Sequence, residues 1–128
     1  MINKKIYKLL LVDDDRIIRE IYEKLFSKEF EIMIAASGNE ALKFLEETIF
    51  HAIVTDIQMP EMSGIELAKK IRSSNTLNGR ALIIGVTATP HSIAKEAFGA
   101  GIAKLFAKPS EFPEIQTYLN HTLQKLGY

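Results

Sequence analysis

Carboxylate, hydroxyl and ammonium side chains stand where short apolar runs of this sequence end. Three consecutive aspartates at 13–15 follow one run, Asp56 and Thr87 come at the ends of two others, and Lys108 follows the last. Carboxylates that lie close together repel one another and tend to hold protons unless a cation intervenes. Magnesium takes oxygen ligands and is usually held by one or two carboxylates together with phosphate oxygens. If these residues meet in the fold, they predict a site for a divalent cation and a phosphoryl group.

Each residue type has a distinct part in such chemistry. With Asp13, Asp14 and Asp56 near a metal, the remaining coordination positions stay open for a phosphoryl group. Asp56 is then placed to be a nucleophile, since aspartate can form an acyl phosphate intermediate. Thr87 can donate a hydrogen bond, and Lys108 can supply a positive charge, to phosphoryl oxygens on which negative charge must be stabilised during transfer.

Five short apolar runs must bring these residues together. They lie at 8–12, 31–36, 51–55, 81–87 and, more weakly, 103–107. Continuous apolar residues over so few positions are typical of strands buried on both faces, which occur in parallel sheets covered by helices. The sequence therefore predicts a parallel sheet whose carboxyl ends carry the polar residues.

Segments with helical spacing separate the runs. Ile17, Ile21 and Leu25 recur every four residues, with Ile18 and Tyr22 beside them, and predict a helix with one apolar stripe. Further apolar stripes predict helices around 41–45, 65–71, 91–100 and 115–126.

Local signals and connectivity support the same arrangement. The Ser-x-x-Glu spacing at 37–40 and 63–66 fits the capping box at a helix start, and Asn78-Gly79 predicts a turn. Alternating strands and helices imply right-handed crossovers and an open, doubly wound α/β sheet, in which functional groups collect at the carboxyl ends of the strands. No repeat or linker interrupts the sequence, so we expect one domain over residues 1–128.

Composition excludes several classes of protein. Sixteen basic residues balance sixteen acidic ones, so the chain lacks the electrostatic footprint of direct nucleic-acid binding. There is no cysteine, which excludes a disulfide framework and a thiolate nucleophile. The apolar run after the first lysines meets three aspartates too soon for a signal peptide, so we expect a cytoplasmic protein with no membrane insertion.

Four motifs, in order along the chain, resemble the receiver domain of two-component response regulators: "LLLVDDD", "IVTDIQMPEMSGIEL", "IIGVTA" and "FAKP". The resemblance implies a flavodoxin-like fold with five parallel strands in the order 2-1-3-4-5 and five helices. It also implies a phosphoacceptor switch that receives a phosphoryl group from the phosphohistidine of a sensor histidine kinase or histidine phosphotransfer protein. Such a domain uses Mg²⁺ or Mn²⁺, changes its affinity for a downstream protein effector, and catalyses only its own phosphorylation and dephosphorylation.

The resemblance also assigns roles by position. Asp56 matches the phosphoacceptor and Asp14 the direct metal ligand. Asp13 matches the acidic residue that acts through water, and the backbone carbonyl of Gln58 matches the third protein ligand of the metal.

The later motifs match in part. Thr87 matches the switch hydroxyl, and Lys108 matches the family's lysine, whose bond to Pro109 is commonly cis. The family usually has an aromatic residue or histidine three positions before that lysine, where this sequence has Leu105. Phe106 is adjacent, but strand alternation directs it to the other face. The usual relay from hydroxyl to aromatic residue is therefore not expected in its ordinary form.

Two other functions remain open at this point. "LLLVDDDRI" also fits the Asp-x-Asp pattern of haloacid-dehalogenase-like phosphatases. A small magnesium-dependent phosphohydrolase would use Asp13 as nucleophile and Asp15 as acid. Otherwise Asp15 is expected to cap the helix that follows it. Leu105 motivates a scaffold with the receiver fold and no switch.

The chain ends at Tyr128, soon after the last predicted helix, so we expect no output domain in it. Both a stand-alone receiver and one excised from a longer regulator or hybrid kinase fit.

Overall fold

The computed structural model describes residues 5–128, and the first four residues of the predicted domain lie outside it. Within the described range the chain forms a parallel sheet of five strands in the order β2-β1-β3-β4-β5. The strands are β1 (Lys8–Val12), β2 (Glu31–Ala35), β3 (Ala52–Asp56), β4 (Leu82–Thr87) and β5 (Lys104–Ala107). The predicted strand order is confirmed, and each predicted run agrees with its strand to within one residue at either end.

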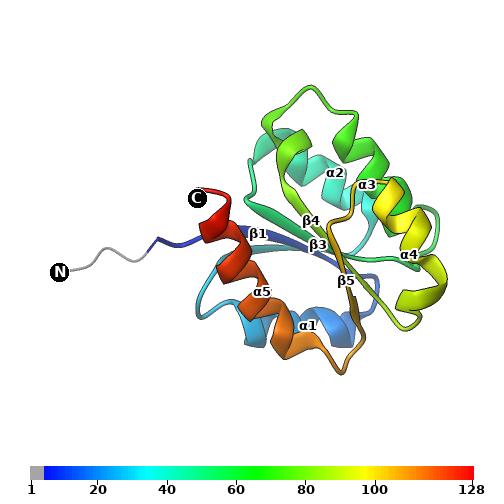
Figure 1. Ribbon diagram of the computed structural model, residues 1–128, viewed down its shortest axis with the longest axis horizontal. Helices are drawn as coiled ribbons and strands as arrows, with labels where there is room; N and C mark the ends of the chain where they lie inside the picture. The colour runs from blue at the N-terminus through cyan, green and yellow to red at the C-terminus, as the bar shows by residue number, and fades with distance from the viewer. Residues whose placement is uncertain (1–4) are drawn as a thin grey trace.

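Helices cover both faces of the sheet. They are α1 (Arg16–Phe26), α2 (Gly38–Glu47), α3 (Gly64–Arg72), α4 (Pro90–Gly99) and α5 (Phe112–Lys125), with a short 3₁₀ helix, η1 (Leu77–Arg80), before β4. Figure 1 shows α1 and α5 on one face and α2, α3 and α4 on the other. None of the helices between residues 5 and 128 has the length and apolar character needed to cross a bilayer.

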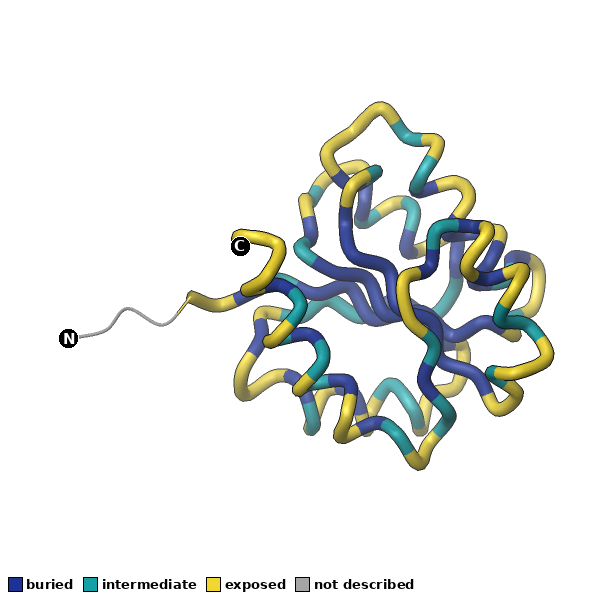
Figure 2. Tube along the Cα trace, viewed as in Figure 1, coloured by how far each residue is buried: buried dark blue, intermediate teal, exposed yellow. Residues whose placement is uncertain are grey.

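The strands supply the centre of two hydrophobic clusters, one on each face of the sheet. Along β1, Leu10 and Val12 belong to the cluster beneath α2, α3 and α4, while Leu9 and Leu11 belong to the cluster beneath α1 and α5. This alternation is the two-residue period of a strand. Apart from Lys8 at the start of β1, the inner strands are buried (Figure 2), which explains why their sequences form nearly unbroken apolar runs.

The predicted apolar stripe of α1 is confirmed at Tyr22 and wrong at Ile17 and Ile21. Ile17 and Ile21 are exposed, at 66% and 38% of their surface, whereas Tyr22 and Phe26 are fully buried and Leu25 is half-buried. The face toward the sheet therefore lies about one residue, or 100°, away from the line of Ile17 and Ile21, on the side of Tyr22. The two aromatic rings pack edge to face, and burying them removes more apolar surface from water than burying the isoleucines would.

The predicted helix starts are borne out with one difference. At the start of α3, Ser63 accepts a hydrogen bond from the Glu66 amide and the Glu66 carboxylate accepts one from Ser63, which completes a capping box. At the start of α2, Ser37 accepts from the Glu40 amide, but the Glu40 carboxylate reaches the Ala36 amide instead. Both arrangements satisfy free amides at a helix start.

The predicted turn at Asn78 is part of η1, and its asparagine is 2% exposed. The side chain donates to the carbonyls of Leu45 and Thr48 at 2.9 and 2.8 Å and accepts from the Phe50 amide at 3.0 Å. Asn78 thus satisfies three main-chain groups, in the last turn of α2 and in the loop between α2 and β3. The sequence offered only a turn signal for this buried role.

Candidate functional site

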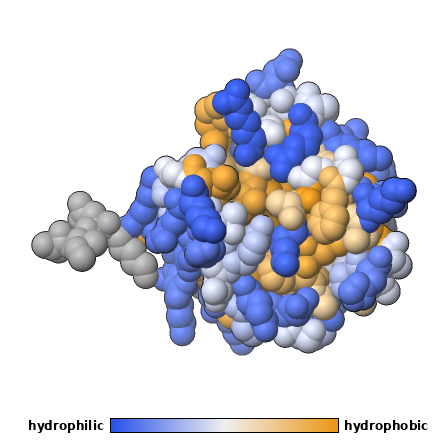
Figure 3. Space-filling model, in the orientation of Figure 1, coloured by the Kyte–Doolittle hydropathy of each residue, from blue (hydrophilic) through white to orange (hydrophobic). Residues whose placement is uncertain are grey.

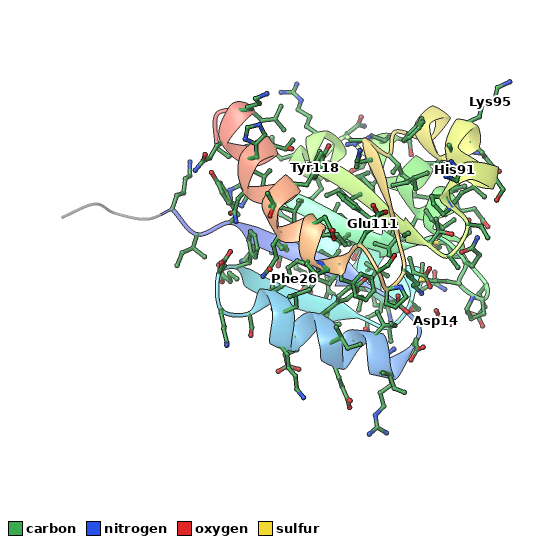
Figure 4. All side chains as sticks on the ribbon, turned by 60° about the horizontal axis from the view of Figure 1, so that its bottom comes forward. Asp14, Phe26, His91, Lys95, Glu111 and Tyr118 are labelled. Atoms are coloured by element: carbon green, nitrogen blue, oxygen red, sulfur yellow. The ribbon has the colours of Figure 1, made fainter. Side chains whose placement is uncertain are left out.

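Three aspartates meet at the carboxyl edge of the sheet. The register pairs Val12 of β1 with Thr55 of β3, so Asp13 and Asp56 follow at neighbouring strand ends. Carboxylate oxygens of Asp13, Asp14 and Asp56 all lie within 4.8 Å of one another. Figure 4 shows Asp14 at this edge, close to the start of α1. The predicted convergence of the carboxylates is therefore present in the fold.

A lysine bridges the two buried carboxylates. Asp13 and Asp56 are 0% and 2% exposed, whereas Asp14 is exposed. The Lys108 ammonium lies 3.1 Å from Asp13 Oδ2 and 3.1 Å from Asp56 Oδ2. Its peptide bond to Pro109 is cis, as the resemblance predicted.

The site carries more negative charge than Lys108 neutralises. Burial, and then the charge of Asp13, raise the pKa of Asp56 to about 6, although Lys108 opposes the change. Burial also raises the pKa of Asp13. Burial on its own would lower the pKa of Lys108, but the two carboxylates outweigh it and raise that pKa. A second positive charge at this edge would stabilise the ionised carboxylates.

The donor set fits a hard divalent cation. Three carboxylates converge on one place, one of them exposed to incoming water and ligands. Asp13 Oδ2 is buried and has the lysine beside it, yet among residues 5–128 no donor forms a hydrogen bond of good geometry with it. Oxygen ligands that leave coordination positions open are the arrangement that magnesium usually takes.

The start of α1 fixes the position of Asp13. The Asp15 amide donates to Asp13 Oδ1 at 2.9 Å, and Arg19 Nη1 donates to the Asp13 carbonyl at 3.0 Å. The Asp15 carboxylate accepts from the Ile17 amide at 2.8 Å and caps α1. The capping interpretation of Asp15 is therefore confirmed.

The loop after β3 returns closely to Asp56. The Gly64 amide donates to the Ile57 carbonyl at 2.9 Å. A Cβ atom on Gly64 would lie 2.2 Å from the Asp56 carbonyl oxygen, so only glycine allows α3 to start here. The close approach fixes the main chain around the predicted nucleophile.

Thr87 lies at the same edge, but its hydroxyl is already engaged. The register pairs Asp56 with Val86, so Thr87 follows one residue beyond that pair. Its hydroxyl donates to Gln58 Oε1 at 2.9 Å and accepts from the Thr89 amide at 3.1 Å. The sequence assigned the Gln58 backbone carbonyl as a metal ligand and gave no sign of this side-chain contact.

Leu105 and Phe106 lie on opposite faces of β5, as strand alternation predicted. Leu105 packs against the cluster beneath α4, and a Cβ atom on Gly85 would lie 2.7 Å from its Cδ2. Phe106 is buried beneath α5, with its ring 5.5 Å from that of Tyr118. Phe106 therefore does not replace Leu105 on the face that carries α4.

Tyr22 is a buried polar residue near the site that the sequence did not single out. Among the described residues its hydroxyl has no hydrogen-bond partner. Burial, followed by the charges of Asp13 and Asp56, raises the pKa of this phenol well above its usual range. The centroid of its ring lies 5.3 Å from the ring centroid of Phe112, at the start of α5. In the sequence it was one member of an apolar stripe, which concealed its position.

A family described as the response regulator receiver domain matches residues 9–120. Stress response regulator protein 1 of Clavispora lusitaniae is 32% identical over 128 residues, covering 97% of this chain and 64% of that protein. Transcriptional regulatory protein CrdR of Helicobacter pylori is 28% identical over 110 residues, covering 85% and 51%. The chain spans about half to two-thirds of the length of such curated relatives.

Two solved structures share the fold over nearly their whole length. Chemotaxis response regulator CheY4 of Vibrio cholerae superposes with a TM-score of 0.81 at 27% identity, covering 93% of this chain and 99% of that one. Response regulator protein TrrA from Thermotoga maritima, in complex with Mg²⁺-BeF, superposes with a TM-score of 0.78 at 32% identity, covering 91% and 98%.

Proposed function

The chain belongs to the response regulator receiver domain family of two-component systems, and we propose from this that Asp56 accepts a phosphoryl group and thereby switches the domain's affinity for a protein partner. Receiver domains are signalling switches rather than classical enzymes. One observation carries the proposal: buried Asp13 and Asp56 share the ammonium of Lys108, with Asp14 exposed beside them. This is an acidic site with a built-in cation for an incoming anion.

The same site is proposed to hold Mg²⁺, or Mn²⁺ in its place. Asp14 and Asp56 would bind it directly, Asp13 through water, and the Gln58 backbone carbonyl would complete the protein ligands. The clustered carboxylates and their raised pKa values support this assignment, as does the Mg²⁺-BeF complex of the related TrrA. When bound, the cation would neutralise charge on the carboxylates and on the phosphoryl oxygens.

The protein's own residues then account for the transfer. A carboxylate oxygen of Asp56 attacks phosphorus, an O–P bond forms, and the P–N bond of the donor phosphohistidine breaks with its electron pair returning to the imidazole. Lys108 follows the developing negative charge from the carboxylates to the phosphoryl oxygens. Thr87 donates its hydroxyl to one of those oxygens once the acyl phosphate has formed.

The partners follow from the same proposal. A sensor histidine kinase or histidine phosphotransfer protein would supply the phosphoryl group, and a protein effector would respond to it. Figure 3 shows apolar side chains gathered over β5 and α4, where Phe98 is 51% exposed, which supports a protein partner on this face. The predicted single receiver domain over residues 1–128 remains part of this proposal.

The phosphohydrolase alternative has less support. It needs Asp15 as a proton donor, but the Asp15 carboxylate caps α1. It also needs Asp13 as nucleophile, yet Asp13 is held through the Asp15 amide on one oxygen and faces Lys108 with the other.

Intact-mass measurement tests the proposed function. The protein is incubated with acetyl phosphate, with Mg²⁺ or with a chelator, and compared with the Asp56→Asn and Asp13→Asn variants. We expect a gain of one phosphoryl group that requires the metal, persists in Asp13→Asn and disappears in Asp56→Asn. A gain that persists in Asp56→Asn and disappears in Asp13→Asn would favour the hydrolase instead.

A further inference from the structure

We infer that the Gln58 side chain is a latch that holds the Thr87 hydroxyl in the unphosphorylated protein and must open before Thr87 can bind a phosphoryl group on Asp56. The inference rests on the proposed function and adds a positioning residue to it. The observation that supports it is the hydrogen bond of 2.9 Å that Thr87 Oγ1 donates to Gln58 Oε1.

The hydroxyl of Thr87 has no spare proton. A threonine hydroxyl donates one hydrogen bond and accepts up to two. Here its proton goes to Gln58 and it accepts from the Thr89 amide at 3.1 Å. Thr87 is fully buried, so water does not compete for the same proton. A hydrogen bond from Thr87 to a phosphoryl oxygen therefore has to replace the bond to Gln58.

Gln58 can leave at low cost. Gln58 is exposed, and its side-chain amide nitrogen makes only a long contact of 3.5 Å with Thr89 Oγ1. When the latch opens, the Gln58 amide returns to water and the Thr87 hydroxyl gains a phosphoryl acceptor. No buried polar group is left without a partner, so the two states are close in energy.

The latch connects the loops that follow β3 and β4. Gln58 lies two residues after Asp56, and the Ile57 amide donates to the Val86 carbonyl at 3.1 Å, which fixes the two loops side by side. Thr89 is the residue before α4. Opening the latch therefore frees the Thr87 hydroxyl. It also breaks one contact between the loop that follows Asp56 and the residue before α4.

Beryllofluoride, a stable mimic of the phosphoryl group, provides the test. It is titrated with Mg²⁺ into the wild-type domain and Gln58→Leu, with Gln58→Ala as a second variant, and its dissociation constant is measured by calorimetry. Because the latch opposes the Thr87 contact, we expect both variants to bind about two- to tenfold more tightly. Ser92→Ala is the matched control: it removes a hydrogen bond of 3.1 Å to the Thr89 carbonyl without touching Thr87, and should bind like wild type.

A double-variant comparison separates the latch from a general change in loop shape. The effect of Gln58→Leu should persist in a Thr87→Ser background, which keeps the hydroxyl, and vanish in Thr87→Val, which removes it. In nitrogen-15 spectra, the side-chain amide signals of Gln58 should move to solvent-exposed positions when beryllofluoride binds.

Three results would overturn the inference. Equal affinity of wild type and both Gln58 variants would show that the latch does not oppose binding. An undiminished effect in Thr87→Val would place the cause outside the hydroxyl. Failure of the wild-type protein to bind beryllofluoride or accept a phosphoryl group would overturn the proposed function and this inference together, whereas the first two results leave the proposed function intact.

Discussion

Asp56→Asn should stabilise the metal-free protein at neutral pH, although it removes the proposed phosphoacceptor. Burial and the neighbouring Asp13 raise the pKa of Asp56 from its ordinary value of 3.8 to about 6. A carboxyl whose pKa is higher in the folded state favours folding most when protonated. Its contribution is therefore present below pH 3.8 and is lost as the pH rises through about 6.

The size of the effect follows from the shift. A change of about two pKa units corresponds to about 3 kcal/mol of unfolding free energy, of which about 2 kcal/mol is lost between pH 4 and pH 7.5. Asparagine does not titrate and has a similar shape. The unfolding free energy of Asp56→Asn minus that of wild type should therefore rise by about 2 kcal/mol over the same interval.

Urea denaturation at the two pH values, with a chelator present, measures this difference. Asp14→Asn is the matched control, because it removes an exposed carboxylate of the same cluster. In a second control Mg²⁺ is added. It should raise the unfolding free energy of the wild-type protein and leave that of Asp56→Asn largely unchanged. A difference that stays constant with pH, or a variant that loses stability relative to wild type as pH rises, would refute the electrostatic reasoning.

Three further substitutions test individual contacts through unfolding free energies and a metal titration. Tyr22→Phe removes a buried hydroxyl without a partner and should stabilise the domain by about 1 kcal/mol; a loss would reveal a partner for that hydroxyl. Asn78→Ala leaves three main-chain groups unsatisfied, two of them in buried hydrogen bonds, and should cost about 2–4 kcal/mol, whereas a loss below about 0.5 kcal/mol would show that water replaces the amide. Gly64→Ala forces a Cβ atom against the Asp56 carbonyl, so it should both destabilise the domain and weaken Mg²⁺ binding; wild-type values for both would contradict the close approach.

The sequence was sufficient to place the strands and the site because both depend on simple repeating geometry. Buried parallel strands read as unbroken apolar runs, and parallel strands present their carboxyl ends at one edge. Asp13, Asp56 and Lys108 were therefore expected to meet, and they do. The short separation between each residue and its strand left little freedom for another arrangement.

Features that depend on side-chain packing could not be predicted in this way. The predicted stripe of α1 is centred on Ile17, Ile21 and Leu25, with Tyr22 only beside it, because four-residue spacing weighs all apolar residues alike. The fold instead buries the larger aromatic rings at Tyr22 and Phe26 most deeply. The hydrogen bond between Gln58 and Thr87 joins residues 29 positions apart, and no local pattern reports it.

The identity of the residue that carries the phosphoryl group tests the proposed phosphoacceptor most directly. After treatment with acetyl phosphate and Mg²⁺, borohydride reduces an aspartyl phosphate to homoserine, and peptide mass spectrometry then locates it. We predict homoserine at position 56 and unmodified aspartate at positions 13 and 14. Homoserine at position 13, or none at any of the three, would contradict this prediction.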